Sequence, residues 1–329
     1  MAKQKQSPSA SKRREQMRQQ RTSQSRSAQQ SRSRNQQRQK SNRSSWWLIG
    51  GIIAMVVVIV GAFIFIANYE AQQSKVGSDT ALKTISSIKP DVFARVDKGT
   101  FNGQISAVKN APVLKGPSGK PEVFYVGGEY CPYCAAQRWA IVSSLSRFGS
   151  FSPLTPILSA EGQVPTFSFY KATYHSNYID FVSRETADNN SPNPGPLESL
   201  TPADQQIVNQ YERPPYAQQQ GIPFMSIGNQ YVSVGPYYSN NVLTGKSYSD
   251  IATAVTDPNS DISRGIVGAA NMLTAAVCKA TNNQPANVCT ADPIPSLQQS
   301  LPQPTASAAS PTQLAQAWQM PEWDVRRRN

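Results

Sequence analysis

The chain has 329 residues and a formal charge of +12, but the charge is concentrated at one end. Residues 1–45 hold 13 of the 32 Lys and Arg residues and one of the 20 acidic residues, so the remaining chain is neutral. The composition therefore excludes a basic domain beyond this tail. Because the tail is rich in Gln, Ser and Arg and nearly devoid of apolar residues, it cannot bury a core, and we expect it to be disordered.

The next segment, residues 46–67, is an apolar run without a charge. A helix of this length spans about 33 Å, which is enough for a bilayer core of about 30 Å. Trp46 and Trp47 suit the headgroup region, and the basic tail lies directly before them. We therefore expect one transmembrane helix that acts as a signal-anchor. A cleaved signal peptide is the alternative, but the run is too long and no small-x-small cleavage site follows it.

This orientation predicts a single-pass protein of the cell membrane, with residues 1–45 in the cytoplasm and the C-terminal domain outside. The lipid bilayer is then a partner, and the basic tail contacts anionic headgroups. Nucleic acid is not expected as a partner, because the tail lacks aromatic residues that stack on bases.

Residues 68–104 have the character of a stalk, with one short amphipathic helix at 81–96 that Pro90 interrupts. The folded domain is expected at 105–290. Within it, a short strand at 112–114 and a central strand at 122–126 precede a helix at 135–148, for which Gly149 is the expected C-terminal cap.

Between that strand and that helix lies the motif Cys131-Pro132-Tyr133-Cys134. A Cys-x-x-Cys at a strand-to-helix junction is the layout of a redox site. A cysteine at a helix N-terminus faces unpaired N–H groups and the positive end of the helix dipole, which favours thiolate. We expect Cys131 to be the solvent-facing nucleophile and Cys134 the buried resolving thiol.

Zinc binding is the main alternative to redox chemistry for a Cys-x-x-Cys motif. A four-cysteine zinc site usually needs a second closely spaced pair, whereas Cys278 and Cys289 are separated by ten residues. The histidine, His175, has no ligand spacing to the cysteines and is expected to be structural. No metal and no other cofactor is expected.

Further along, residues 166–174 predict a strand and residues 188–203 a loop. Thr201 followed by Pro202 predicts the start of a helix that ends near Tyr211. Residues 221–234 then predict a turn, a strand that begins at Pro223, a Gly-Asn turn and a second strand.

The Cys-Pro-Tyr-Cys motif and Ile222-Pro223, about 90 residues later, resemble the thioredoxin superfamily, and most closely its DsbA-like thiol–disulfide oxidoreductases. The chain also resembles a family of membrane-anchored thioredoxin-like proteins. The resemblance covers residues 105–280. It implies an α/β, thioredoxin-like fold with a helical insertion, here preceded by one transmembrane helix.

The resemblance also implies roles for residues around the motif. Pro223 matches the cis-proline that faces the redox pair, and Ile222 would turn its backbone toward an extended substrate. Pro132 and Tyr133 would also contact substrate.

One position departs from the family's pattern. Relatives often carry a buried acid six residues before the first cysteine, and here that residue is Tyr125. Glu122 and Glu129 are nearby carboxylates at other positions, so the proton acceptor for the resolving thiol stays open.

The C-terminal part predicts a helix at 261–279 that ends near Cys278. We expect Cys278 and Cys289 to form a structural disulfide; a second redox pair is the alternative. Residues 291–329 are expected to be mostly disordered, with a short helix at 313–319.

Together these features predict a membrane-anchored extracytoplasmic thiol–disulfide oxidoreductase that acts on exported cysteine-containing proteins through Cys131 and Cys134. A membrane redox partner, such as a quinone-linked oxidase or an electron carrier, would recycle it. A reductase or isomerase uses the same chemistry, and sequence does not set the direction. The alternative from a different functional class is a protein that is not an enzyme: a thioredoxin-like binding module with a structural disulfide.

Overall fold

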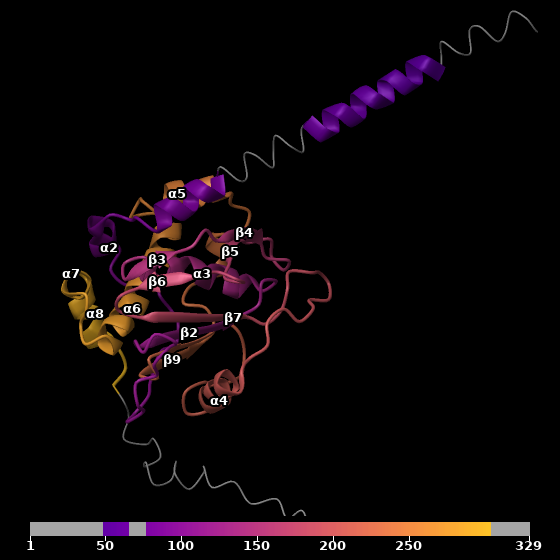
Figure 1. The fold of residues 1–329 in the computed structure, drawn as a ribbon. Helices are drawn as coiled ribbons and strands as arrows, with labels where there is room; N and C mark the ends of the chain where they lie inside the picture. Colours follow the sequence, from indigo (N-terminus) through magenta and orange to yellow (C-terminus); the bar gives the residue numbers. More distant parts are fainter. Residues whose placement is uncertain (1–48, 66–76, 304–329) are drawn as a thin grey trace, which may run out of the picture. The chain divides into compact units, whose positions relative to one another are not determined.

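The structure, a computed structural model, describes residues 49–65 and 77–303 (Figure 1). The chain divides into two units, Met1–Ala71 and Gln72–Asn329. In the first unit, residues 49–65 form a helix with exposed side chains. The expected transmembrane segment at 46–67 extends beyond the described residues at both ends, and the basic tail lies outside them. No helix within the described ranges is both long and apolar enough to cross a membrane.

The second unit is built on a mixed sheet with the strand order β1-β9-β8-β2-β7. The internal strand β2 pairs in parallel with β7 and antiparallel with β8. Its alternate side chains enter two cores, one with Val123 and Tyr125 and the other with Phe124 and Val126. The strands are β1 (Ser106–Ala107), β2 (Glu122–Gly127), β7 (Asp180–Glu185), β8 (Phe224–Ile227) and β9 (Tyr231–Val234).

Helices cover both faces of this sheet. The larger core holds α3 (Pro132–Leu145) and α6 (Asp261–Ala280), and the smaller core holds α4 (Pro202–Tyr211). Figure 1 shows α3 on one side of β2 and β7 and α4 on the other. The second unit is therefore an α/β structure, and its sheet is buried because both faces carry apolar side chains.

Helix α3 begins earlier than the predicted helix at 135–148. Cys131 is its N-cap residue and Pro132 its first residue, as suits a position that needs no N–H donor. The helix ends at Leu145 with Ser146 as C-cap, and Gly149 opens strand β3 (Gly149–Phe151). The prediction that Gly149 caps the helix was therefore wrong.

The segment between α3 and β7 forms two small sheets, in which β3 pairs with β6 (Tyr174–Ser176) and β4 (Thr155–Leu158) pairs with β5 (Pro165–Ser168). The prediction of one strand over 166–174 was wrong. The chain turns after β5, where Lys171 has a φ of 58° and the Ala172 N–H donates to the Phe169 carbonyl.

Several predicted elements were confirmed. Helix α4 starts with a capping box between Thr201 and Asp204. The β8–β9 hairpin turns at Gly228 and Asn229, which both have positive φ. Helix α6 matches the helix predicted at 261–279. The expected strand at 112–114 is missing from the described structure, where Lys115 makes an isolated bridge to Pro121.

The folded region is longer than the predicted 105–290. The helix predicted at 81–96 is present as two helices, residues 77–85 and α2 (Pro90–Val96). Ala81, Ile85 and Phe93 are buried in the larger core, so this segment is part of the fold and not a stalk. The reason is packing of α2 against α6, where the Asn271 amide donates to the Phe93 carbonyl at 2.9 Å.

The C-terminal end of the folded region also lies further along. Apolar side chains of α8 (Ile294–Ser300) are buried in the larger core, so the chain stays folded past residue 290. The short helix predicted at 313–319 lies outside the described residues. The remaining elements are η1 (Asn240–Val242), α5 (Tyr248–Ala254) and α7 (Ala286–Cys289).

Candidate redox site

The structure places Cys131 and Cys134 as two thiols at the first turn of α3. The Cys131 sulfur accepts a hydrogen bond from the Cys134 N–H at 3.3 Å, as an N-cap side chain does. Strand β2 ends at Gly127, so a short turn delivers Cys131 to the start of the helix. The strand-to-helix layout predicted for the motif is confirmed.

The two thiols have opposite pKa shifts. A hydrogen bond from the Cys134 thiol is the main cause that lowers the pKa of Cys131 to about 7. The N–H groups of Cys134 and Tyr133 and the positive charge of Arg138 lower it further, against burial, which raises it. Burial raises the pKa of Cys134 well above its ordinary value. Cys131 is thus the thiol of the pair that loses its proton first as the pH rises, and Cys134 keeps its proton to higher pH.

Both sulfurs are more enclosed than the sequence predicts. Cys131 is 5% exposed and Cys134 is fully buried, whereas Tyr133 between them is 50% exposed. The solvent-facing position expected for Cys131 is therefore corrected to a nearly buried one. The reason is that its sulfur turns back toward the N–H groups of its own helix.

Sequence reasoning missed a buried ion pair next to the motif. Arg138 Nε and Nη2 donate to the two carboxylate oxygens of Glu185 at 2.8 and 2.7 Å, and both side chains are fully buried. Arg138 lies seven residues after Cys131 and four after Cys134, so helical spacing alone could have placed it below the pair. Glu185 comes from β7, and only the strand pairing reveals it.

The position six residues before Cys131 is occupied by a buried tyrosine, Tyr125. Burial raises the pKa of Tyr125 well above its ordinary range, and its hydroxyl has no hydrogen-bond partner among the described residues. The hydroxyl lies against Gly127, where an added Cβ would come within 2.1 Å of it, so residue 127 must lack a side chain.

The two nearby carboxylates have other environments. Glu129 accepts a hydrogen bond from the Ser168 hydroxyl at 2.5 Å. Burial raises the pKa of Glu122 to about 7, and the charges of Asp204 and Asp180 add to this shift.

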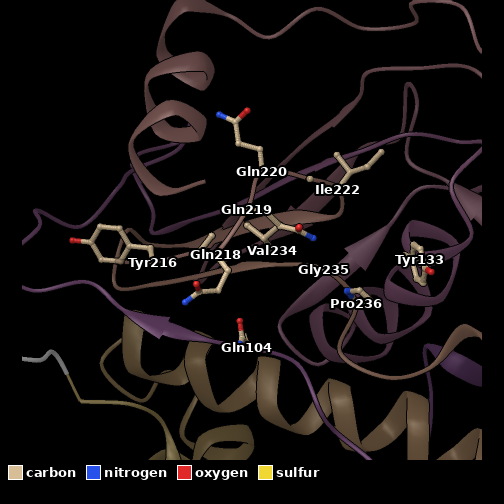
Figure 2. A pocket seen from close by; sticks show the side chains of 12 residues that line it. Gln104, Tyr133, Tyr216, Gln218, Gln219, Gln220, Ile222, Val234, Gly235 and Pro236 are labelled. Atoms are coloured by element: carbon tan, nitrogen blue, oxygen red, sulfur yellow. The ribbon is translucent and has the colours of Figure 1, made fainter. Parts of the chain in front are cut away.

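A recess of about 390 Å³ lies beside the motif (Figure 2). It brings together Tyr133 and Ile222, two of the residues predicted to contact substrate. None of the twelve described residues around it is charged. The lining is Gln104, Tyr133, Tyr216, Ala217, Gln218, Gln219, Gln220, Gly221, Ile222, Val234, Gly235 and Pro236.

The other two predicted substrate contacts lie outside this lining. Pro132 faces the Gly162 turn, where an added Cβ would lie 3.3 Å from the Pro132 side chain. Pro223 is buried just before β8, its carbonyl accepts the Gly235 N–H at 2.8 Å, and the Ile222–Pro223 peptide bond is cis.

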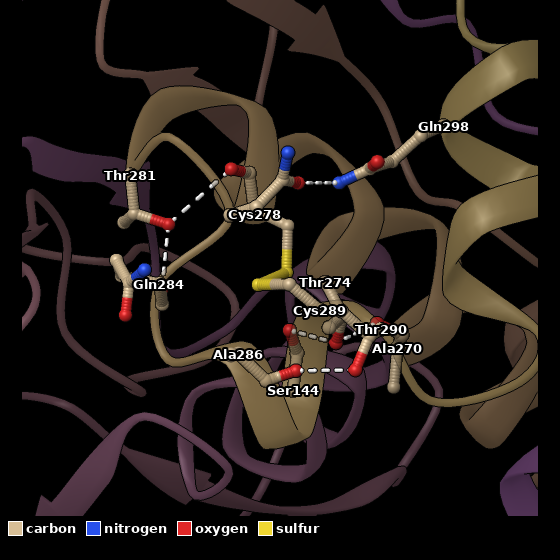
Figure 3. Close-up of a disulfide and its surroundings, with 11 residues drawn as sticks. Ser144, Ala270, Thr274, Cys278, Thr281, Gln284, Ala286, Cys289, Thr290 and Gln298 are labelled. Carbon is tan, nitrogen blue, oxygen red and sulfur yellow. Dashed lines mark hydrogen bonds between the residues drawn. A yellow bond between two sulfur atoms is a disulfide. The ribbon is translucent and has the colours of Figure 1, made fainter.

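The second cysteine pair forms a disulfide, as predicted (Figure 3). Cys278 near the end of α6 and Cys289 at the end of α7 have Cα atoms 5.6 Å apart, and both are buried. The Thr281 hydroxyl bridges the carbonyls of Cys278 and Gln284 at 3.3 and 2.6 Å, which ties down the connecting turn.

Among the described residues, no group of three or more His, Cys, Asp or Glu side chains is arranged to hold a metal ion. His175 lies exposed in β6, opposite Ser150 of β3.

These features define the second unit as an α/β protein with a dithiol at the start of a buried helix. The chain belongs to the family described as Domain of unknown function (DUF929), whose model matches residues 106–279. This match spans β1 to the last turn of α6, and it includes the Cys-x-x-Cys motif and Ile222-Pro223. No curated protein and no solved structure matches the chain.

Proposed function

We propose that this protein is a thiol–disulfide oxidoreductase, with Cys131 as nucleophile and Cys134 as resolving thiol. The observation that carries the proposal is the asymmetry of the pair. The Cys131 sulfur accepts a hydrogen bond from a backbone N–H at the start of the helix, and Cys131 is slightly exposed to solvent. Cys134 is buried and keeps its proton. Exchange needs one thiolate that attacks and one thiol that stays near it.

The reaction that this arrangement supports is oxidation of a substrate dithiol. A substrate thiolate attacks the Cys131 sulfur of the oxidised pair, the Cys131–Cys134 bond breaks, and Cys134 leaves with the electron pair and gains a proton. The second substrate thiolate then attacks the substrate sulfur of the mixed disulfide, and Cys131 leaves as thiolate. The substrate loses two electrons and two protons; the enzyme pair gains both electrons and one proton, on Cys134, and the other proton goes to solvent. The reverse sequence reduces a substrate disulfide.

The fold proposed with this activity is thioredoxin-like of the DsbA type. Its support is the order of elements around the dithiol: β2, the helix α3 that carries both cysteines, the parallel strand β7, and the antiparallel hairpin β8–β9. Helix α4 lies between β7 and β8 in the chain and would be the helical insertion.

The proposed location is the outer side of the cell membrane, with residues 46–67 as a single-pass anchor and residues 1–45 in the cytoplasm. The support is the uncharged apolar run after a basic tail. Exported cysteine-containing proteins would be the substrates, and a membrane redox partner, either a quinone-linked oxidase or an electron carrier, would recycle the pair.

The uncharged recess beside Tyr133 and Ile222 is the proposed binding site for the part of the substrate that flanks the reacting substrate cysteine. Its volume falls within the range of about 300 to 1,000 Å³ typical of binding clefts. Glutamine amides and tyrosine hydroxyls supply hydrogen-bonding groups there, because amides and hydroxyls both donate and accept.

Replacing the resolving thiol tests the proposal. The Cys134→Ser variant should accumulate mixed disulfides with substrate proteins through Cys131, because the second thiol is no longer available to release them. Adducts are read by non-reducing gels and mass spectrometry of the Cys131 peptide, and the Cys131→Ser/Cys134→Ser variant is the matched control. If Cys134→Ser traps nothing, the protein is instead a binding module. Titration of the Cys131–Cys134 couple against glutathione then sets the direction.

A further inference from the structure

A buried charge pair lies directly below the dithiol. Arg138 and Glu185 come from α3 and β7, and their side chains are fully buried. Removing two charges from water is costly, and replacing a buried ion pair by apolar residues is often neutral or stabilising. Stability alone therefore gives no strong reason to keep this pair, and its contacts point toward the cysteines.

The first contact links Arg138 to the turn before Cys131. Arg138 Nη2 donates to the Gly128 carbonyl at 2.8 Å, and the same carbonyl accepts the Cys131 N–H at 3.2 Å. Glu185 holds the guanidinium in place by accepting two parallel hydrogen bonds, a geometry that fixes the plane of the guanidinium. The backbone at Cys131 is thus anchored to β7 through Arg138.

The second contact is electrostatic. Arg138 interacts with both cysteines and favours the charged form of each. The other titratable groups that face this cluster are Tyr125 of β2 and Tyr130, which both interact with the two cysteines, and Glu185 of β7. Arg138 Nη1 is buried without a hydrogen-bond partner in the described structure, so one donor of the guanidinium is not used by Glu185 or Gly128.

We propose that Arg138 is a positioning residue for thiol exchange: clamped by Glu185, it holds the Gly128 turn that carries Cys131 and supplies the buried positive charge that stabilises thiolate in the pair. This proposal rests on the proposed function and names the residues that tune its nucleophile. It makes Arg138 the source of the positive charge that acts on both cysteines.

The test compares variants that change the charge in opposite directions. The probe is iodoacetamide, which reacts with thiolate, and the reaction of Cys131 in the reduced full chain is followed from pH 5 to 9 by mass spectrometry. Arg138→Met removes the cation and should slow the reaction at pH 6 by about threefold at most, because a tenfold loss of thiolate is partly offset by the higher nucleophilicity of a less acidic thiolate. Glu185→Gln leaves the cation without its counter-charge and should speed the reaction.

Two further variants separate charge from geometry. Arg138→Lys keeps the charge but loses the planar fork, and it should slow the reaction less than Arg138→Met does. Arg138→Met/Glu185→Leu removes both charges and therefore leaves no unpaired buried ion. This double variant replaces a single variant that does not fold. It should still slow the reaction, because Arg138 is the member of the pair that interacts with Cys131.

A merely structural role predicts a different pattern. It would change the reaction rate of Cys131 in the same direction in Arg138→Met and in Glu185→Gln, because both variants break the same ion pair. That result, or unchanged rates in Arg138→Met and in the double variant, overturns the proposal. Because the measurement needs no substrate protein, its outcome is independent of the trapping experiment with Cys134→Ser.

Discussion

The two cysteine pairs of this protein lie at opposite ends of helices and have opposite environments. Cys131 and Cys134 lie at the start of α3 as thiols, next to backbone N–H groups that donate to the Cys131 sulfur and next to a buried ion pair. Cys278 and Cys289 lie near the ends of α6 and α7, joined as a disulfide in the larger core. The positive charge of Arg138 favours thiolate in the first pair, whereas the second pair is closed as a bond between two buried residues.

The comparison shows why spacing alone does not assign a cysteine pair. At a helix N-terminus, backbone dipoles and hydrogen-bond donors favour a negative sulfur, which makes the pair reactive. At a helix C-terminus the dipole has the opposite sign, and a buried bond there is inaccessible to attacking thiolates. Position along the helix therefore separates a candidate for exchange from a candidate cross-link.

The largest effect expected from this difference is on stability. Replacing both Cys278 and Cys289 by Ser should lower the free energy of unfolding by about 3 kcal/mol, because the loop of 11 residues is no longer closed in the unfolded chain. Urea unfolding followed by circular dichroism measures this. Trapping of substrate through Cys131 should remain.

The matched control is Cys131→Ser/Cys134→Ser. Its unfolding is compared with that of the wild-type protein in which Cys131 and Cys134 are reduced. It should change the unfolding free energy far less and abolish trapping. If the Cys278→Ser/Cys289→Ser variant instead loses exchange while its stability is intact, the second pair is redox-active and the contrast between the pairs is broken.

The next effect concerns how the reactivity of Cys131 depends on pH. With a pKa of about 7, its thiolate fraction rises about tenfold from pH 6 to pH 8 and then levels off. An ordinary cysteine with a pKa of about 8.5 gains roughly 75-fold over the same range without a plateau. The alkylation rate of the Cys131 peptide in the reduced chain, measured by mass spectrometry, distinguishes the two.

Cys134 provides the comparison within the same molecule. Its pKa is raised by burial, so its alkylation should still be rising at pH 9. Equal pH profiles for the two thiols would contradict the asymmetry on which the proposed function rests.

The elements around the dithiol could be predicted because their signals are local. The apolar run before Cys131, the proline after it, and the caps at Thr201 and Pro202 each act within a few residues. The Cys278–Cys289 pairing was also predicted from local sequence. These signals specify elements but not which elements pack together.

The parts that could not be predicted depend on long-range packing. The helix at 77–85 was predicted only from residue 81 onward and as part of a stalk, and α8 was not predicted. The apolar residues of both enter a core that α6 and its neighbours complete. Likewise, Arg138 meets Glu185 only because β2 and β7 pair in parallel, with Gly127 beside Glu185. No local pattern in the sequence contains that pairing.

The smallest effect concerns Tyr125, which lies buried six residues before Cys131. Its buried hydroxyl has no hydrogen-bond partner in the part of the chain that the structure describes, and an unsatisfied buried polar group is a cost to the folded state. Tyr125→Phe keeps the ring and its edge-to-face contact with Phe169, with centroids 5.4 Å apart. We expect it to raise the unfolding free energy by about 1 kcal/mol in urea titrations.

The same variant tests whether Tyr125 is the proton acceptor for Cys134. Because burial raises the pKa of the phenol further above its ordinary value, the hydroxyl stays protonated and cannot accept a proton from Cys134 at neutral pH. Exchange by Tyr125→Phe should therefore match wild type, measured as the rate at which the oxidised pair is opened by glutathione. A tenfold loss of this rate with intact stability would assign the phenol a part in proton transfer.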